Sequence, residues 1–184
     1  MRKSIILPGW MSRVKNYRMG EGSDIWEEFG DPMKLPEAEY IVCHSLGCHY
    51  ALSNWQNGRD NKLILVNPPI FKRNIFAWAW RWLRYLAAEG PGVSFHDIGA
   101  KEIIAGIKNC QKLMQPDFRI VLKKLPKENL TIIRGKNDNY FCDREVADFA
   151  RAENIRLIEV ADCGHNWCGG LKNEVLKIIG DEKS

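Results

Sequence analysis

The chain has 184 residues, of which 45% are hydrophobic and 27% are charged. This length predicts a single domain, and this composition excludes disordered and fibrous proteins. The net charge of +4 is small, and it predicts no nucleic-acid partner, because nucleic-acid-binding domains carry a stronger basic excess.

The cysteines and the N-terminus bear on the compartment. Six cysteines are present and none forms a C-x-x-C pair, so the usual zinc-ribbon and thioredoxin motifs are absent. The first eight residues hold only three consecutive large apolar residues, which is too few for a signal peptide. The chain also lacks a run of about 18 apolar residues, so we expect no transmembrane segment. We therefore expect free thiols in a reducing cytoplasm.

Five short apolar runs predict β-strands. They cover residues 4–7, 40–43, 63–66, 130–133 and 156–160. Several are continuously apolar and β-branched, which is typical of strands buried on both faces of a parallel sheet. Helical patterns lie between and after them, over residues 24–29, 46–56, 143–152 and 173–179. This alternation predicts an α/β fold with a compact, doubly wound, mostly parallel sheet of about five strands flanked by helices.

Residues 70–126 interrupt the alternation, because they contain no good strand pattern. They show helical patterns over residues 74–88, 100–113 and 118–125. We expect a helical cap or lid here, inserted into one domain that spans residues 1–184. The Gly-Pro-Gly sequence at residues 90–92 predicts its hinge or a surface turn.

The clearest functional motif is Cys43-His44-Ser45-Leu46-Gly47, which ends a predicted strand and opens a predicted helix. A tight strand–turn–helix with small residues two before and two after a serine lifts its hydroxyl above the sheet. Ser45 is therefore the candidate nucleophile. The alternative is an ordinary turn in which Ser45 caps the helix.

A serine hydroxyl needs a base to take its proton, and the chain offers four histidines. His165 follows the last predicted strand after a glycine turn, at the carboxyl edge of the sheet where ligands gather. We therefore expect His165 to be the base, the alternative being a capping or core histidine. We expect His44 to be structural or to line the pocket, and His49 to be packed on its helix. His96 lies in the predicted cap.

The base in turn needs a carboxylate that holds its tautomer. Asp138 follows a predicted strand and the Gly135 turn, so it also lies at the carboxyl edge. Asp143 precedes a helical pattern and suits a helix cap, and Asp162 is too close to His165 in sequence. We therefore expect Asp138 to be the acid, the alternative being a turn residue.

The chain order Ser45, Asp138, His165, with each residue after a predicted strand, resembles that of the α/β-hydrolases. The short length and the His-Ser-Leu-Gly-Cys string are more loosely similar to the small retinoblastoma-binding-protein-like serine hydrolases. The resemblance implies an α/β-hydrolase fold that lacks the first strands, because the chain opens with what would be the third. It implies a serine hydrolase that cleaves a carboxylic ester or thioester through an acyl-enzyme. Alternatives on this fold are a lyase, an acyltransferase, or a protein that only binds small molecules or partners.

The same resemblance implies an oxyanion hole made of two backbone N–H groups. One belongs to Leu46, directly after the nucleophile. The other belongs to Trp10, with Met11 as the alternative, in the loop after the first strand. Gly9 permits a close backbone approach there, and with His44 it is expected to line the substrate pocket.

An aromatic segment at residues 75–86 carries three of the seven tryptophans. Trp78 and Trp82 fall on one helical face, which suits the wall of a substrate pocket. The alternatives are simple packing of the cap and a helix lying in a membrane surface. Arg81 and Arg84 form a narrow basic strip that suits an acidic acyl-carrier protein as a partner.

The expected substrate is a small-molecule ester or thioester. No cofactor is expected. Cys163, His165 and Cys168 match no standard zinc spacing, so no metal is expected either.

Overall fold

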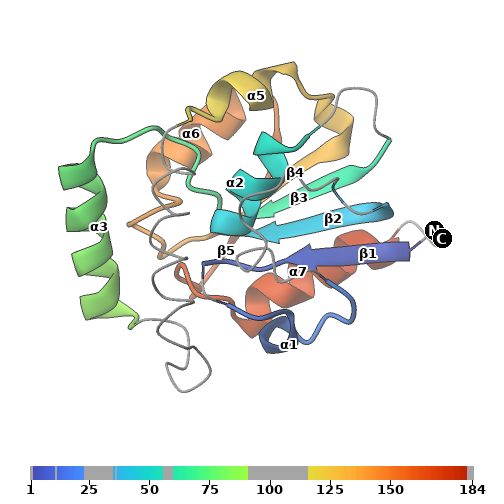
Figure 1. Ribbon diagram of the computed structural model, residues 1–184, viewed down its shortest axis with the longest axis horizontal. Helices are drawn as coiled ribbons and strands as arrows, with labels where there is room; N and C mark the ends of the chain where they lie inside the picture. The colour runs from blue at the N-terminus through green and yellow to red at the C-terminus, as the bar shows by residue number, and fades with distance from the viewer. Residues whose placement is uncertain are drawn as a thin grey trace.

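The computed structural model describes residues 2–10, 12–22, 35, 37–55, 60–90 and 116–181. In this part the chain forms a five-stranded parallel sheet with the order β1-β2-β3-β4-β5 (Figure 1). The strands are β1 (Arg2–Leu7), β2 (Ala38–His44), β3 (Lys62–Val66), β4 (Leu130–Gly135) and β5 (Arg156–Val160). Each predicted strand lies within an observed one, so the predicted α/β sheet is confirmed.

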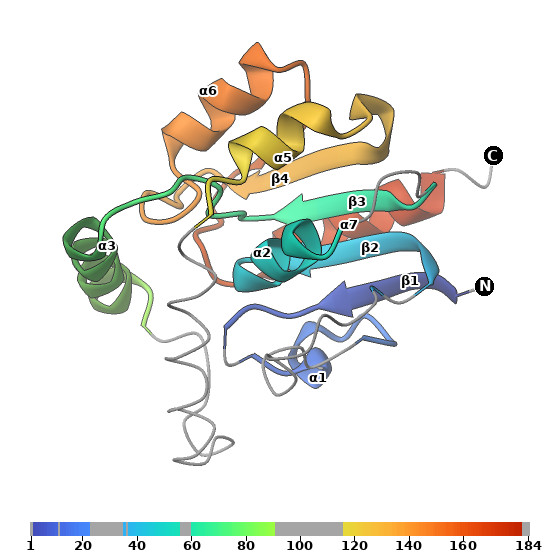
Figure 2. The ribbon, with the colours of Figure 1, turned by 45° about the horizontal axis from the view of Figure 1, so that its top comes forward.

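Helices cover both faces of this sheet (Figures 1 and 2). The helices are α1 (Val14–Tyr17), α2 (Leu46–Ser53), α3 (Ile75–Ala88), α5 (Arg119–Lys124), α6 (Arg144–Ala152) and α7 (Gly169–Asp181), with a 3-10 turn at Lys127–Asn129. α2, α5 and α6 lie on one face, and α1 and α7 lie on the other. The helices predicted at residues 24–29 and 100–113 lie outside the described residues.

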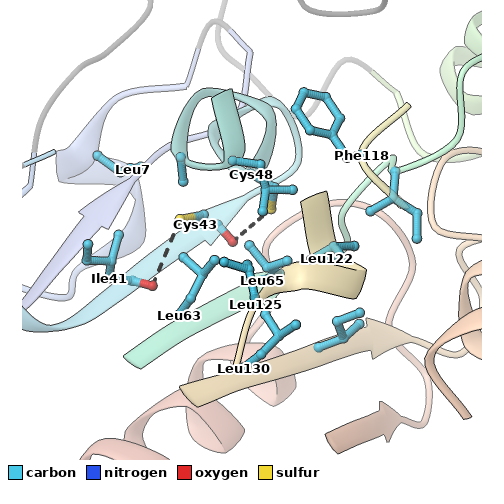
Figure 3. Packing of buried hydrophobic residues seen from close by; sticks show 14 of the residues in the cluster. Leu7, Ile41, Cys43, Cys48, Leu63, Leu65, Phe118, Leu122, Leu125 and Leu130 are labelled. Carbon is cyan, nitrogen blue, oxygen red and sulfur yellow. Dashed lines mark hydrogen bonds between the residues drawn. The ribbon is translucent and has the colours of Figure 1, made fainter. Parts of the chain in front are cut away.

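Successive residues of the central strands point into two separate cores. Ile41 and Leu65 belong to the core under α2, α5 and α6, together with Phe118 and Leu122 (Figure 3). Their neighbours in sequence belong to the core on the face of α1 and α7. Because both faces are covered, the central strands are apolar without a break.

The predicted cap divides into two parts in the structure. α5 packs into the sheet core through Phe118, Leu122 and Leu125, so it belongs to the helical layer of the sheet. α3 instead lies beyond the carboxyl ends of the strands, the edge that carries Ser45 (Figures 1 and 2). Residues 91–115 lie outside the described residues, so the extent of the cap stays a prediction.

α3 begins where Asn74 accepts a hydrogen bond from the backbone N–H of Ala77. Its inner face buries Trp78 and Tyr85, which pack against Phe141. Its outer face is apolar and exposed: Ile75, Phe76, Trp80, Leu83 and Leu86 are all exposed hydrophobic residues. Only the inner face of α3 therefore bears on the carboxyl edge of the sheet.

The expectation of six free thiols is wrong for one pair. Cys163 and Cys168 form a disulfide, because the loop between β5 and α7 brings their Cα atoms within 6.6 Å. Cys43, Cys48 and Cys142 are free and buried, and burial raises the pKa of each thiol. These three thiols are therefore packing residues, not nucleophiles.

Among the described residues, no helix has both the length and the apolar character needed to cross a membrane.

Candidate active site

Ser45 occupies a strained turn between β2 and α2. Its backbone has φ 50° and ψ −118°, a conformation that non-glycine residues rarely adopt and that is found mainly where function requires it. Gly47 makes the turn sterically allowed, because a Cβ atom at this position would lie 2.3 Å from the carbonyl oxygen of Leu7. The Ser45 hydroxyl is thereby held at the carboxyl edge of the sheet.

A continuous line of hydrogen bonds joins Ser45, His165 and Asp138. The Oγ atom of Ser45 lies 2.8 Å from Nε2 of His165, and Nδ1 of His165 lies 2.6 Å from Oδ2 of Asp138. Because a carboxylate only accepts, Nδ1–H donates to Asp138, which leaves Nε2 to accept from the Ser45 hydroxyl. The structure thus brings together the three residues that the sequence places 27 and 120 positions apart.

Asp138 is completely buried and remains a carboxylate because it is well solvated by hydrogen bonds. It accepts the backbone N–H groups of Tyr140, Phe141 and Cys142 at 3.0–3.1 Å. Burial by itself raises the pKa of Asp138, but the charge of His165, its hydrogen bond and the backbone donors outweigh burial. The pKa of this carboxyl therefore lies below its ordinary value.

Arg134 holds the loop that carries Asp138. Its buried guanidinium donates to the carbonyl oxygens of Asp138 at 3.1 Å and Cys142 at 2.6 Å. It also forms an ion pair with Glu159 on β5 at 2.8 Å.

The competing acid, Asp143, plays a different role. It caps α6 and forms ion pairs with Arg73 at 3.1 Å and Arg81 at 2.6 Å. Asp143 is therefore not the partner of the histidine.

Asn67 connects the acid loop to the histidine loop. Its Nδ2 donates to the carbonyl oxygens of Gly164 and His165, both at 2.9 Å. Its Oδ1 accepts from the N–H of Gly135 at 2.7 Å. The sequence pattern indicates only a turn residue before two prolines here, although the place of Asn67 at the carboxyl end of β3 is a usable signal.

Glu89, at the end of α3, supports the histidine from the other side. Its carboxylate accepts from the backbone N–H of His165 at 2.9 Å and of Asn166 at 3.0 Å. Tyr85 on the same helix donates to the side chain of Asn166 at 2.6 Å. Nothing in the sequence pattern indicates these contacts, which span 76 to 81 positions.

A small cavity of about 120 Å³ opens beside Ser45. Its lining residues are Gly9, Trp10, Ser12, Asn16, Tyr17, His44, Ser45, Trp82, Tyr85, His165, Asn166 and Trp167. Three of the predicted pocket residues, Gly9, His44 and Trp82, are among them. Trp78 is not, because its ring stacks on Phe141 at 5.6 Å. None of these lining side chains is an acid, a lysine or an arginine.

Two backbone N–H groups suit a developing oxyanion: that of Trp10, which lines the cavity, and that of Leu46, which directly follows Ser45. Among the described residues, those of Trp10 and Leu46 have no hydrogen-bond acceptor. The N–H of Gly9 is already committed to the hydroxyl of Tyr17 at 2.8 Å. Met11, the alternative donor, lies outside the described residues. The role of Trp10 and Leu46 stays a prediction.

Comparison with known proteins identifies the fold. No family model and no curated protein matches the sequence. Among solved structures, an α/β hydrolase from a Medee basin deep-sea metagenome library matches with a TM-score of 0.65 and 14% identity, over 97% of this chain and 87% of that one. The chain has the α/β-hydrolase fold.

Other structural neighbours of the same fold carry different activities. A thermophilic esterase from Thermogutta terrifontis matches with a TM-score of 0.56 and 16% identity, over 100% of this chain and 88% of that one. An N-formylmaleamic acid deformylase from Pseudomonas putida S16 matches with a TM-score of 0.53 and 12% identity, over 89% and 86%. At these identities the likeness establishes the α/β-hydrolase fold and not the reaction. The narrower resemblance to the retinoblastoma-binding-protein-like group stays a prediction.

The remaining candidates for chemistry lie away from this cavity. His49 packs on Phe118, with ring centroids 4.5 Å apart, and hydrogen-bonds the carbonyl oxygen of Pro69. It is the packed helix residue that the sequence predicts. His96 lies outside the described residues. In the part of the chain that the structure describes, no cluster of histidine, cysteine and carboxylate side chains is suited to a metal ion.

Proposed function

We propose that the protein is a serine hydrolase that cleaves a carboxylic ester or thioester through an acyl-enzyme. The observation that carries this proposal is the hydrogen-bonded line from Ser45 through His165 to Asp138, at 2.8 and 2.6 Å. The strained backbone of Ser45 and the cavity beside it support the same function. A protein that only binds its ligand needs none of these three side chains in this order.

In the proposed reaction, His165 takes the Ser45 proton through Nε2 as Oγ attacks the carbonyl carbon of the ester. Asp138 stabilises the resulting imidazolium through Nδ1–H. The N–H groups of Trp10 and Leu46 bind the oxyanion, and each such donor contributes about 3 kcal/mol in a well-studied serine protease. The imidazolium then protonates the leaving alcohol or thiol, and water repeats the sequence to release the acid.

The cavity favours a small, uncharged substrate. A volume of about 120 Å³ is close to that of a cavity that holds one benzene ring. The aromatic walls from Trp10, Trp82, Tyr85 and Trp167 suit an apolar acyl group. We therefore propose an ester or thioester with a short acyl group as the substrate.

An acyl-carrier partner has less support. Of the two arginines that suggested it, Arg81 is bound within the chain to Asp143 at 2.6 Å and to the carbonyl oxygen of Tyr140. Arg84 lies over the ring of Tyr140 at 5.6 Å and is exposed. We therefore do not include a carrier protein in the proposal.

We keep the cytoplasm as the proposed compartment on the basis of the buried free thiols of Cys43, Cys48 and Cys142. The Cys163–Cys168 disulfide counts against it, because disulfides are rare in a reducing compartment.

The proposal is tested by a fluorophosphonate probe, followed by mass spectrometry of the labelled peptide. We expect an adduct on Ser45, and hydrolysis of p-nitrophenyl acetate that falls at least about 10³-fold in Ser45→Ala. Ser53→Ala, at the far end of the same helix, is the matched control and keeps both signals. The melting temperature of Ser45→Ala stays near that of the wild type, because the substitution removes one hydroxyl.

Two outcomes would contradict hydrolysis. A binding protein gives no adduct on Ser45. A lyase or acyltransferase gives the adduct but releases no acid from esters when no acceptor other than water is present.

A further inference from the structure

A second line of hydrogen bonds, which joins Gly9, Tyr17 and His44 to the backbone of His165, runs through the same site. The backbone N–H of Gly9 lies 2.8 Å from the hydroxyl oxygen of Tyr17, and that oxygen lies 2.7 Å from Nδ1 of His44. At its other end, Nε2 of His44 lies 2.9 Å from the carbonyl oxygen of His165. This line of hydrogen bonds thus begins in the loop of Trp10, the predicted oxyanion donor, and ends on the backbone of His165, the predicted base.

The chemistry of the end groups fixes the direction of every bond. An amide N–H only donates, so the Tyr17 oxygen accepts from Gly9. A carbonyl oxygen only accepts, so Nε2–H of His44 donates to His165. A neutral imidazole has one N–H, which leaves Nδ1 as the acceptor for the Tyr17 hydroxyl proton. The Nε2–H tautomer of His44 therefore allows every hydrogen bond in this line.

The electrostatics of His44 agree with this neutral tautomer. Burial, followed by the charge of His165, lowers the pKa of His44 to about 3. The ring of His44 is therefore uncharged at neutral pH. Burial also raises the pKa of Tyr17, so its hydroxyl keeps the proton that it donates.

Packing fixes both rings in place. Only 2% of Tyr17 and 5% of His44 are exposed. The ring of Trp167 lies 4.8 Å from Tyr17 and 5.7 Å from His44. The loss of one of these hydrogen bonds leaves a buried polar group without a partner. Such a group lowers the stability of the fold.

We propose that Tyr17 and His44 are positioning residues, which tie the loop of the predicted oxyanion donor to the backbone of His165. They act through Gly9 and His165 and take no part in bond making. Through them, the oxyanion N–H of Trp10 and the base keep a fixed separation, as the attack on a carbonyl group requires. The inference rests on the proposed function, because it assigns Trp10 and His165 their roles.

The first test compares Tyr17→Phe with Tyr40→Phe. Both tyrosines are buried in the same core, but Tyr40 lies near the amino end of β2, away from Ser45. We expect Tyr17→Phe to lower kcat for p-nitrophenyl acetate about 10- to 100-fold with KM changed less than about twofold, since misplacement of reacting groups acts on the transition state. We expect Tyr40→Phe to keep kcat.

The second test needs no activity. In wild-type protein, ¹⁵N NMR of His44 should show the Nε2–H tautomer, and the Gly9 amide should exchange slowly with solvent. In Tyr17→Phe, the Gly9 amide loses its acceptor and should exchange faster. His44 should keep Nε2–H, because that proton still donates to the carbonyl oxygen of His165, but the ¹⁵N shift of its Nδ1 should change, because Nδ1 loses the Tyr17 donor. If neither the Gly9 exchange nor the Nδ1 shift changes, the proposed line of hydrogen bonds is wrong whether or not the protein is a hydrolase.

Substitution of His44 covers the case in which Tyr17→Phe does not fold. A glutamine side chain can place an N–H near the position of Nε2, whereas leucine cannot. We expect His44→Gln to retain at least about ten times the kcat of His44→Leu. Equal kcat values in these two variants, or equal kcat in Tyr17→Phe and wild type, would overturn the inference. A wild type without a Ser45 adduct would overturn the proposed function instead.

Discussion

Asp138 and Asp143 are five positions apart, and their surroundings give them different roles. The carboxylate of Asp138 is fully buried and bonds His165 at 2.6 Å. That of Asp143 accepts the N–H of Glu145 at the start of α6 and pairs with two arginines. Only the first can orient the imidazole and stabilise its charged form.

We therefore expect Asp138→Asn to lower kcat by several orders of magnitude, since the same change costs about 10⁴-fold in a serine protease triad. Asp143→Asn is the matched control. Asparagine still caps a helix well, and we expect a loss of less than about tenfold. Ester hydrolysis by the two purified variants measures this ranking, and a reversed order would assign the acid to Asp143.

Cys43 lies two residues before Ser45, where the tight strand–turn–helix is expected to need a small residue. The structure shows why a cysteine fits there. Its side chain is buried in the core under α2 (Figure 3). The carbonyl oxygen of Cys43 accepts from the thiol of Cys48 at 3.3 Å. The close backbone approach occurs at Gly47, where an added Cβ would contact Leu7 at 2.3 Å. The turn therefore depends on Gly47 more than on a glycine at position 43.

At the scale of elements, α3 links the two loops that carry Asp138 and His165. Arg81 bonds Asp143 at 2.6 Å, on the side of the acid loop. Glu89 bonds the backbone of His165 and Asn166 on the other side. Between these anchors, the ring of Trp82 lies 4.9 Å from Trp10 and 5.1 Å from Phe141. α3 is thus placed to form one wall of the cavity.

We expect Trp82→Ala to widen the cavity and shift the preference toward longer or bulkier acyl groups. For short esters, KM should rise more than kcat falls, because the contact acts on the ground state and the transition state alike. Trp80→Ala is the matched control on the same helix, since 62% of that residue is exposed. A panel of p-nitrophenyl esters from acetate to octanoate measures the shift.

If Trp82 contributes packing alone, the outcome differs. The melting temperature of Trp82→Ala would then fall by the equivalent of about 3–5 kcal/mol. The chain-length profile would stay that of the wild type, and the pocket-wall role of Trp82 would be wrong.

The loop between β5 and α7 carries His165 and is closed by the Cys163–Cys168 disulfide. A cross-link over a loop of this length stabilises a protein by about 2 kcal/mol in the chain-entropy model. We expect a reductant to lower the melting temperature by about 4–8 °C. The Cys163→Ser, Cys168→Ser double variant should have the melting temperature of the wild type in reductant, and added reductant should not change it. A wild type that melts equally with and without reductant would show that the two thiols are not joined.

At the scale of the whole molecule, local patterns predict what local interactions determine. Apolar runs predict the five strands, and the small residues around Ser45 predict the tight turn between β2 and α2. The pattern of α5 predicts a cap helix, because a sequence window does not show that Phe118 packs with the sheet core. The contacts of Asn67, Glu89 and Tyr17 with the histidine loop or with His44 join positions 27 to 98 residues apart. Such contacts depend on the finished fold and leave no periodic signal in the sequence.

The ionisation of Asp138 should contribute to the pH dependence of the unfolding free energy in acid. The folded pKa of this carboxyl is below its ordinary value, which is about 3.9 in an unfolded chain. Between those two pKa values the unfolded chain binds a proton that the folded chain does not bind. The carboxylate therefore stabilises the fold fully above about pH 5, and this contribution is lost as the pH falls through the folded pKa.

Asp138→Asn lacks this ionisation, so the difference in unfolding free energy between wild type and variant should shrink as the pH falls from about 6 to 3. Urea unfolding followed by circular dichroism at each pH measures the difference. Asp117, whose pKa is also lowered by its hydrogen bond from Arg119, is present in both proteins and cancels. A difference that stays constant over this range would mean that Asp138 is not held ionised by His165 and the backbone donors around it.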